Sequence, residues 1–426
     1  MDNLNSLIHA EDYMIAYLGD YTNDLLGFAS ILVVILLTYF ITLRFPAISK
    51  ILLVALAIRV SLMLAGHYLV MLPESDGDSE DFESGAWMLA QGGFFYVWNY
   101  LTLPNPHAFI WVIALIYSLI DRSILMIQSI SIFFGIGCVI LGWLTAKKLW
   151  DDRTAKKVAW MITLFPSLVL YSVLVMREVY IVFFILLSIY GVVSWAKNYS
   201  FKSILLAMIG FIGGAFFHGA ILVGAITFIV IVGISSLVRF YKSIINYRIN
   251  LKVLTFILLF LMSSALYLSN SIDVSYLGKF EEAANISNLM YLTELNTRGS
   301  ASWPKWLIIS SPYEMFYKVP IRGIYFVLAP FPWDVSKAKH LIPLFDAILY
   351  IYFIYLILQN RKVIWRDPAL RAILIILIAY ILVFSIGVGN FGTGLRHRSK
   401  FVVMFILLAA PLLKKFIFLK KKNLGS

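Results

Sequence analysis

The sequence predicts an all-α polytopic membrane protein with about eleven spanning helices. The hydrophobic share is 61% and the mean hydropathy is +0.87, whereas a soluble domain is about half apolar. Apolar runs of about 18 or more residues recur along the chain, and each is long enough to cross about 30 Å of hydrocarbon. Basic residues also gather in alternate connecting segments, which is typical of loops on the cytoplasmic side of a membrane.

We expect spans at 24–43, 51–72, 124–146, 158–174, 178–196, 203–217, 219–237, 253–269, 340–359, 370–388 and 401–417. The apolar run at 107–120 has only about 14 residues, so it predicts an interfacial or re-entrant helix rather than a full span. The first twenty residues lack the basic start of a signal peptide, and we expect insertion to depend on the spans themselves.

The basic residues predict the topology of this single transmembrane domain, 1–426. The segment KKLWDDRTAKK at 147–157 and the lysine-rich end of the chain are internal if the N-terminus lies outside and the C-terminus inside. Three large or unusual outer segments then follow, at 73–123, 270–339 and 389–400. This topology accounts for most of the net charge of +12, so the charge does not indicate a nucleic-acid partner. The single cysteine, Cys138, lies in an apolar run and predicts a packing residue.

The first outer segment carries a cluster of acids. The run PESDGDSEDFESGAW places six of the 23 acidic residues within ten positions, and an aromatic amphipathic stretch follows it. A carboxylate at the membrane surface can accept a proton from an acceptor hydroxyl as a general base. It can also hold a divalent cation such as Mg²⁺ or Mn²⁺ beside a phosphate. A solvated acidic loop without chemistry is the plain alternative.

The last outer segment is the basic counterpart of that cluster. GNFGTGLRHRSKF brings Arg396, His397, Arg398 and Lys400 together just before the last expected span. Arginine forks suit phosphate oxygens, and glycine-rich backbone amides add donors. Side chains that only anchor the helix at the lipid headgroups are the alternative.

Other ionisable residues fall within or beside the expected spans, where a charge is costly and usually faces a cavity or a partner. Arg59 and Asp346 lie inside spans, and a central transport path would need such residues. His218 ends an apolar helix and fits either a packing or a catalytic role. Two further sets are candidates for phosphate contacts or for structural ion pairs and anchors, namely Arg177 with Glu178, and Arg322.

The chain resembles the GT-C superfamily of membrane glycosyltransferases. The resemblance is carried by DGDSEDFESGAWMLAQGG with its spaced Asp78, Phe82 and Ala86, by LFPSLVLYSVLVMRE, and by the arginine-bearing loop before the last span. It covers roughly 73–220 and 387–411. Wzy-type polymerases of O-antigen and capsule are similar to the chain in size, helix number and outer arginines.

The resemblance implies a GT-C-like fold with large outer loops and a sugar donor linked to a polyprenyl phosphate or diphosphate, such as undecaprenyl phosphate. It implies that Asp78 is the base, with Asp76 and Asp81 as rivals. Arg396, Arg398 and Lys400 would hold the departing phosphate, helped by Arg322 and Arg177, and His397 and His218 would assist protonation. It further implies a glycan or lipid acceptor, a chain-length regulator or other assembly protein as partner, and a bacterial inner membrane with the active face periplasmic.

Two other classes of function remain open from the sequence. A flippase or transporter of lipid-linked sugars would need ionisable residues along a central path, which Arg59 and Asp346 suggest. A structural membrane subunit would need no reactive cluster. The concentration of acids and arginines in the outer segments favours the enzyme.

Overall fold

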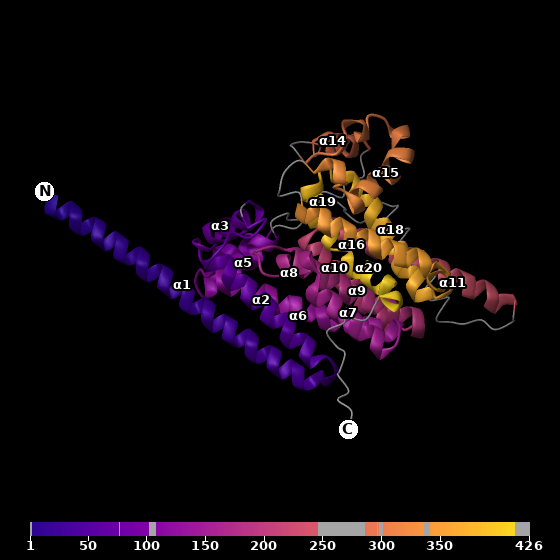
Figure 1. Cartoon of the computed structure of the whole chain (residues 1–426), viewed down its shortest axis with the longest axis horizontal. Helices are drawn as coiled ribbons and strands as arrows, with labels where there is room; N and C mark the ends of the chain where they lie inside the picture. Colours follow the sequence, from indigo (N-terminus) through magenta and orange to yellow (C-terminus); the bar gives the residue numbers. More distant parts are fainter. Residues whose placement is uncertain are drawn as a thin grey trace, which may run out of the picture. The chain divides into compact units, whose positions relative to one another are not determined.

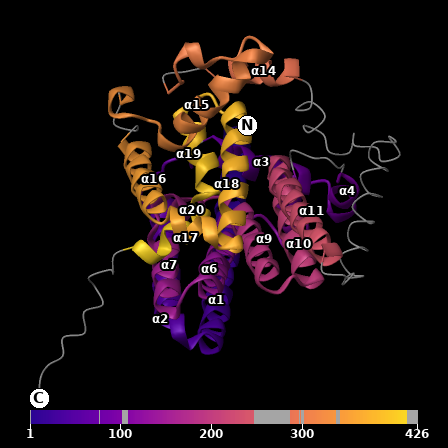
Figure 2. The same ribbon diagram turned by 90° about the vertical axis from the view of Figure 1, so that its right-hand side faces the viewer.

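The computed structural model describes residues 2–75, 77–101, 108–245, 286–295, 297, 301–335 and 341–413. Within these ranges the secondary structure is helical. An isolated antiparallel β-bridge joins Ser302 and Asn390. Figures 1 and 2 show the helices in two perpendicular views. The chain divides into two compact units. Unit 1 comprises Met1–Trp143 and Val158–Phe183, and unit 2 comprises Leu144–Lys157 and Phe184–Ser426.

Six helical segments in the described part are long and apolar enough to cross a membrane, which makes the chain a multi-pass membrane protein. They are Asn23–Arg44, Pro46–Tyr68, Ile124–Leu149, Glu178–Asn198, Gly219–Ser243 and Pro368–Gly387. Shorter apolar helices accompany them. The prediction of an all-α membrane protein is thus confirmed for the described residues. The expected span at 253–269 lies outside them, and the count of eleven and the orientation stay predictions.

In unit 1, α1 (Asp2–Arg44) and α2 (Ser49–Tyr68) form a helical hairpin through a short 3₁₀ turn at Pro46–Ile48. Asp24 joins the open end of the hairpin. Its carboxylate accepts a hydrogen bond from the Tyr68 hydroxyl at 3.0 Å and lies 3.6 Å from Nε2 of His67. The first part of α6 (Ile124–Leu149) belongs to the same unit.

The expected span at 158–174 is wrong as a single helix. The structure ends α7 (Asp152–Leu164) before Pro166 and starts α8 (Pro166–Tyr171) with it. Proline has no N–H to donate to the carbonyl four residues earlier, which is that of Ile162. The buried Arg59 guanidinium donates to the carbonyls of Ile162 at 3.4 Å and Thr163 at 3.3 Å, and to the Ser172 hydroxyl at 3.0 Å. Arg59 therefore supplies hydrogen bonds to backbone carbonyls at the helix break that the proline creates.

The first predicted outer segment contains three helices of unit 1, α3 (Asp78–Ala90), α4 (Phe94–Asn99) and α5 (Ala108–Leu119). Gly77 and Gly93 precede α3 and α4 with φ of 93° and 79°, a left-handed conformation that glycine adopts without steric cost. α3 packs along α5. The twelve residues of α5 are too few to span a bilayer.

Helix α9 (Glu178–Asn198) begins in unit 1 and continues from Phe184 in unit 2, where α10 (Phe201–Phe217) and α11 (Leu222–Ile245) follow it. A 3₁₀ turn at Gly219–Ile221 joins α10 to α11, and His218 lies between α10 and this turn. In the described part of the chain the unit also contains α14 (Ile286–Leu295), α15 (Met315–Leu328), α16 (Leu341–Gln359), α17 (Arg361–Arg366), α18 (Pro368–Gly387), α19 (Phe391–Ser399) and α20 (Val402–Ala409).

Two of the predicted outer segments meet in unit 2. The backbone N–H of Trp303 donates to the carbonyl of Gly389 at 2.8 Å, and that of Phe391 donates to the carbonyl of Ala301 at 3.0 Å. Asn390 lies between these contacts and caps α19 by accepting the N–H of Thr393 at 2.8 Å. The long segment at 270–339 thus fixes the start of the basic helix α19.

Candidate functional site

The acidic cluster of unit 1 is displayed on α3. Asp78 is the first residue of the helix, and Asp78, Glu80 and Asp81 are all exposed. Carboxylates in the first turn lie at the positive end of the helix dipole. The third candidate base, Asp76, lies outside the described residues. Asp78 and Asp81 therefore keep the exposure that a base acting on an acceptor hydroxyl requires.

Glu83 has a different role from the other acids of the cluster. Its side chain is buried and accepts two hydrogen bonds from the Arg122 guanidinium, at 2.9 and 2.7 Å, and one from the Tyr117 hydroxyl at 3.0 Å. Burial, followed by the nearby Glu83 carboxylate, raises the pKa of Tyr117. The group ties α3 to α5. The sequence gives no sign of this pairing, because Glu83 and Arg122 are 39 positions apart.

Arg177 lies against α3, and Glu178 follows it. The Arg177 guanidinium lies 5.5 Å from the centre of the Phe82 ring, close enough for a cation–π interaction. Glu178 is buried as the first residue of α9. In unit 1 the structure thus brings Arg177 to the acidic helix, next to the aromatic residue of the Asp78–Phe82–Ala86 pattern.

Unit 2 brings together two candidate histidines and Lys400, which are distant in sequence. The rings of His218 and His397 lie 5.3 Å apart, edge to face. Both pack on Phe384 of α18, with ring centres at 5.1 and 5.4 Å. Lys400 is fully buried, with its ammonium 2.8 Å from Nδ1 of His397 and 5.7 Å from the Phe384 ring. We call these four residues the histidine cluster.

The contact between Lys400 and His397 sets the tautomer of the ring in the state in which Lys400 is an ammonium. A lysine ammonium has three donors and no acceptor, so a hydrogen bond to Nδ1 requires Nδ1 without a proton. A neutral His397 then carries its proton on Nε2 and is a hydrogen-bond donor at that atom. In that state the histidine cluster combines a buried cation with an imidazole donor, an arrangement suited to an anionic group.

Arg398 is turned into the protein instead. Its guanidinium donates to the Asp346 carboxylate at 3.0 Å, to the carbonyls of Val327 and Pro343 at 3.1 and 2.9 Å, and to that of Ala329 at 2.5 Å. The side chain is 1% exposed, and these partners lie at the end of α15 and the start of α16. Arg398 therefore anchors α15 and α16 to α19, and its role as a phosphate contact stays a prediction. The neighbouring Arg396 is only partly buried.

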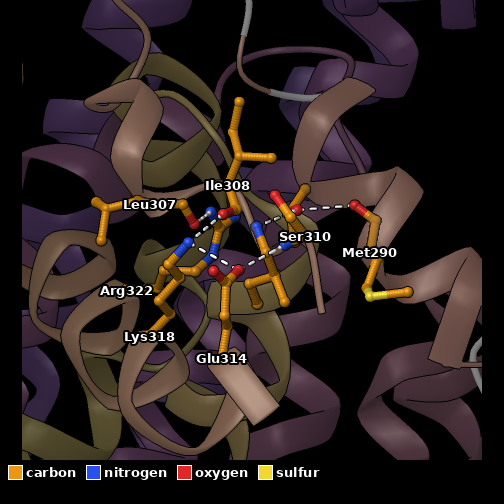
Figure 3. Close-up of polar contacts among 9 residues, drawn as sticks. Met290, Leu307, Ile308, Ser310, Glu314, Lys318 and Arg322 are labelled. Atoms are coloured by element: carbon orange, nitrogen blue, oxygen red, sulfur yellow. Dashed lines mark hydrogen bonds and ion pairs between the residues drawn. The ribbon is translucent and has the colours of Figure 1, made fainter. Parts of the chain in front are cut away.

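Arg322 is likewise an internal anchor. Its guanidinium donates to the carbonyl of Leu307 at 2.9 Å (Figure 3). It also donates to the carbonyls of Ser385, Ile386 and Val388, at 2.6 to 3.2 Å. Three of these carbonyls lie at the C-terminal end of α18, where a helix has no backbone donors of its own. In the same view Lys318 donates to the Glu314 carboxylate at 2.8 Å and to the carbonyl of Ile308 at 2.6 Å. The basic side chains of Lys318 and Arg322 thus both stabilise the fold around α15.

A divalent cation remains an expectation from the sequence. In the ranges that the structure describes, no group of three or more histidine, cysteine, aspartate or glutamate side chains is placed to hold a metal ion.

Comparison with known proteins gives one distant structural similarity. No family model matches the sequence, and no curated protein does. Among solved structures, the chain is similar to the archaeal oligosaccharyltransferase AglB from Archaeoglobus fulgidus, solved with an inhibitory peptide and a dolichol-phosphate. The identity is 13% and the TM-score 0.47 over 87% of this chain and 50% of that one, so the chain spans about half the length of that protein.

Proposed function

We propose that the protein is a membrane glycosyltransferase that moves a sugar or an oligosaccharide repeat unit from a polyprenyl phosphate or diphosphate to an acceptor hydroxyl. The observation that carries the proposal is the histidine cluster. A buried ammonium beside an imidazole donor is suited to the charge of a departing phosphate.

The reaction forms one bond and breaks one. The acceptor oxygen attacks the anomeric carbon of the sugar, the bond from that carbon to the phosphate oxygen breaks, and its electron pair stays on the phosphate. Asp78 takes the proton of the acceptor hydroxyl, with Asp81 as the second exposed candidate and Asp76 as a third. Lys400 stabilises the phosphate charge, His397 donates from Nε2, and His218 supports the His397 ring. Arg396 is a further candidate contact for the phosphate in unit 2, and Arg177 stays a candidate phosphate contact in unit 1.

The finer part of the proposal is a polymerase of the Wzy type. In this role the protein would join undecaprenyl-linked repeat units of O-antigen or capsule on the periplasmic face of a bacterial inner membrane. A chain-length regulator would then be its partner, and a divalent cation near the acids would screen the phosphate. The exposed acids of α3 support an acceptor that arrives from the aqueous side.

The buried ionisable residues do not favour the alternative of a flippase or transporter. Arg59 donates to two backbone carbonyls at the break between α7 and α8, and Asp346 binds Arg398. Both residues that suggested a central path therefore have structural partners within their own units.

The test is transfer by the purified protein in lipid nanodiscs, given a synthetic polyprenyl-diphosphate repeat unit. A product ladder is expected for a polymerase, and a single added sugar for a monosaccharide transferase. Asp78→Asn, which removes the base, and His397→Ala should each lower the rate by at least about 10²-fold. Glu80→Gln, an exposed acid on the same helix, is the matched control and should keep the wild-type rate. Labelled lipid that crosses liposome membranes without any transfer would replace the enzyme with a flippase.

A further inference from the structure

Helix α15 has its charged residues on the wrong side for a helix in water. Its two charged residues, Lys318 and Arg322, are 8% and 0% exposed and bind groups inside the protein. The opposite side carries Phe316, Tyr317 and Ile324, which are 84%, 53% and 52% exposed. A surface helix in water normally turns its apolar stripe inwards and its charges outwards. The surroundings of α15 must therefore suit apolar side chains.

The outward side chains form one continuous stripe. Tyr313 just before the helix, then Tyr317, Pro320 and Ile324 follow at spacings of three or four residues, and Phe316 lies beside them. The stripe contains no charged residue. Tyrosine and phenylalanine dominate it, which is typical of the boundary between lipid headgroups and acyl chains.

The position of α15 identifies what covers this stripe. The Ser385 hydroxyl lies 3.5 Å from the carbonyl of Val319, and a methyl group on Gly323 would lie 3.2 Å from Cγ2 of Ile381. The two contacts step in opposite directions along the chains, so α15 runs antiparallel to the C-terminal half of α18. That helix is one of the six candidate spans. The outward residues of that half include Ile378, 45% exposed, and Val383, 38% exposed, which lipid covers in a spanning helix.

Helix α15 is too short to cross a bilayer by itself. Fourteen residues give a helix of about 21 Å, which is shorter than about 30 Å of hydrocarbon. The Arg398 guanidinium binds the carbonyls of Ala329 and Pro343, so the end of α15 lies beside the beginning of α16. A helix that is too short to span and that packs along a candidate span is suited to a re-entrant position.

We propose that α15 is a re-entrant helix embedded in the membrane beside α18, with the stripe of Tyr313, Phe316, Tyr317 and Ile324 in contact with lipid acyl chains. The partners of the two buried charged residues explain why α15 can lie within the membrane. Lys318 and Arg322 meet a carboxylate and backbone carbonyls, which are the partners that charged groups find within a membrane. The proposal does not depend on the enzymatic activity.

Site-directed fluorescence in lipid tests the proposal. Cys138, the single cysteine, is replaced with Ser, and Phe316→Cys or Ile324→Cys then carries an environment-sensitive fluorophore in phosphatidylcholine nanodiscs. We expect blue-shifted emission, loss of most of the emission with doxyl-labelled acyl chains, and protection from aqueous iodide. Ile378→Cys on α18 is the lipid-facing control, and Glu80→Cys on α3 is the water-facing control.

Two results would overturn the proposal. Quenching by iodide at the level of the Glu80→Cys label would place the stripe in water, as for a surface that binds a glycan. Resistance to both quenchers would show that protein, such as a second copy of the chain, covers it. Tyr313→Cys gives a repeat of the measurement at a position 82% exposed, should one of the other variants fail to fold.

Discussion

The acidic helix α3 of unit 1 and the basic helix α19 of unit 2 place one charged residue of each cluster in an internal ion pair. In α3 the pair is Glu83 with Arg122, whose side chains are 7% and 37% exposed. In α19 it is Arg398 with Asp346, at 1% and 3%. The first pair is open to water on its arginine side, whereas the second is enclosed by backbone carbonyls.

The difference shows how firmly each cluster is held. A buried charge without its partner keeps the full cost of desolvation, but a partly exposed charge recovers hydration when the partner is removed. The basic helix α19 therefore depends on its internal pair far more than the acidic helix α3 does. The outward residues of both helices remain available for chemistry because the inward ones fix the backbone.

The strongest test of the comparison is Arg398→Ala. It leaves Asp346 buried without its partner and three carbonyls without donors, so we expect a loss of about 3–5 kcal/mol in the free energy of unfolding. The measurement is reversible unfolding in mixed micelles. Arg396→Ala, two positions earlier and only partly buried, is the control and should change stability little. Equal losses in the two variants would contradict the anchoring role of Arg398.

Arg322→Gln should have the next largest effect. A glutamine amide cannot reach the four carbonyls that the guanidinium binds, so the end of α18 loses its donors. We expect a loss of about 2–3 kcal/mol in the same unfolding measurement, given the usual cost of buried polar groups without partners. Lys305→Ala, which removes an exposed base from the same region, should remain within about 0.5 kcal/mol of wild type. A stable Arg322→Gln variant would show that water satisfies these carbonyls.

Glu83→Gln tests the more exposed ion pair, Glu83 with Arg122. We expect it to lower the free energy of unfolding by about 1.5–2 kcal/mol, because it replaces charge-assisted hydrogen bonds with neutral ones. A double-mutant cycle with Tyr117→Phe separates the two partners of the carboxylate. Glu80→Gln on the exposed side of α3 is the matched control. A loss as large as that of Arg398→Ala would remove the distinction between the two helices.

The fold class followed from composition, but the direction of individual side chains did not. Arg396, His397 and Arg398 are consecutive, and about 100° of helix rotation per residue points them in three directions. Which one turns inwards depends on Asp346, 52 positions away, and no local pattern contains that information. The missing N–H of Pro166 is enough to predict a helix break there. The sequence does not predict that Arg59 donates to the carbonyl of Ile162 at this break. The meeting of His218 with His397 likewise required the packing of α10 and α19 on Phe384.

A third ion pair, Glu314 with Lys318, extends the comparison to a more exposed carboxylate and gives the smallest effect. The hydrogen bond from Lys318, with help from the N–H of Ser310, lowers the pKa of Glu314 below its ordinary value of 4.5. A lowered pKa stabilises the fold above the ordinary value, and the contribution disappears as the pH falls through the lowered pKa. Between pH 7 and pH 4 the Tm of wild type should therefore fall slightly more than that of Glu314→Gln. Parallel Tm curves for the two proteins would show that the pair contributes nothing measurable, as many exposed pairs do.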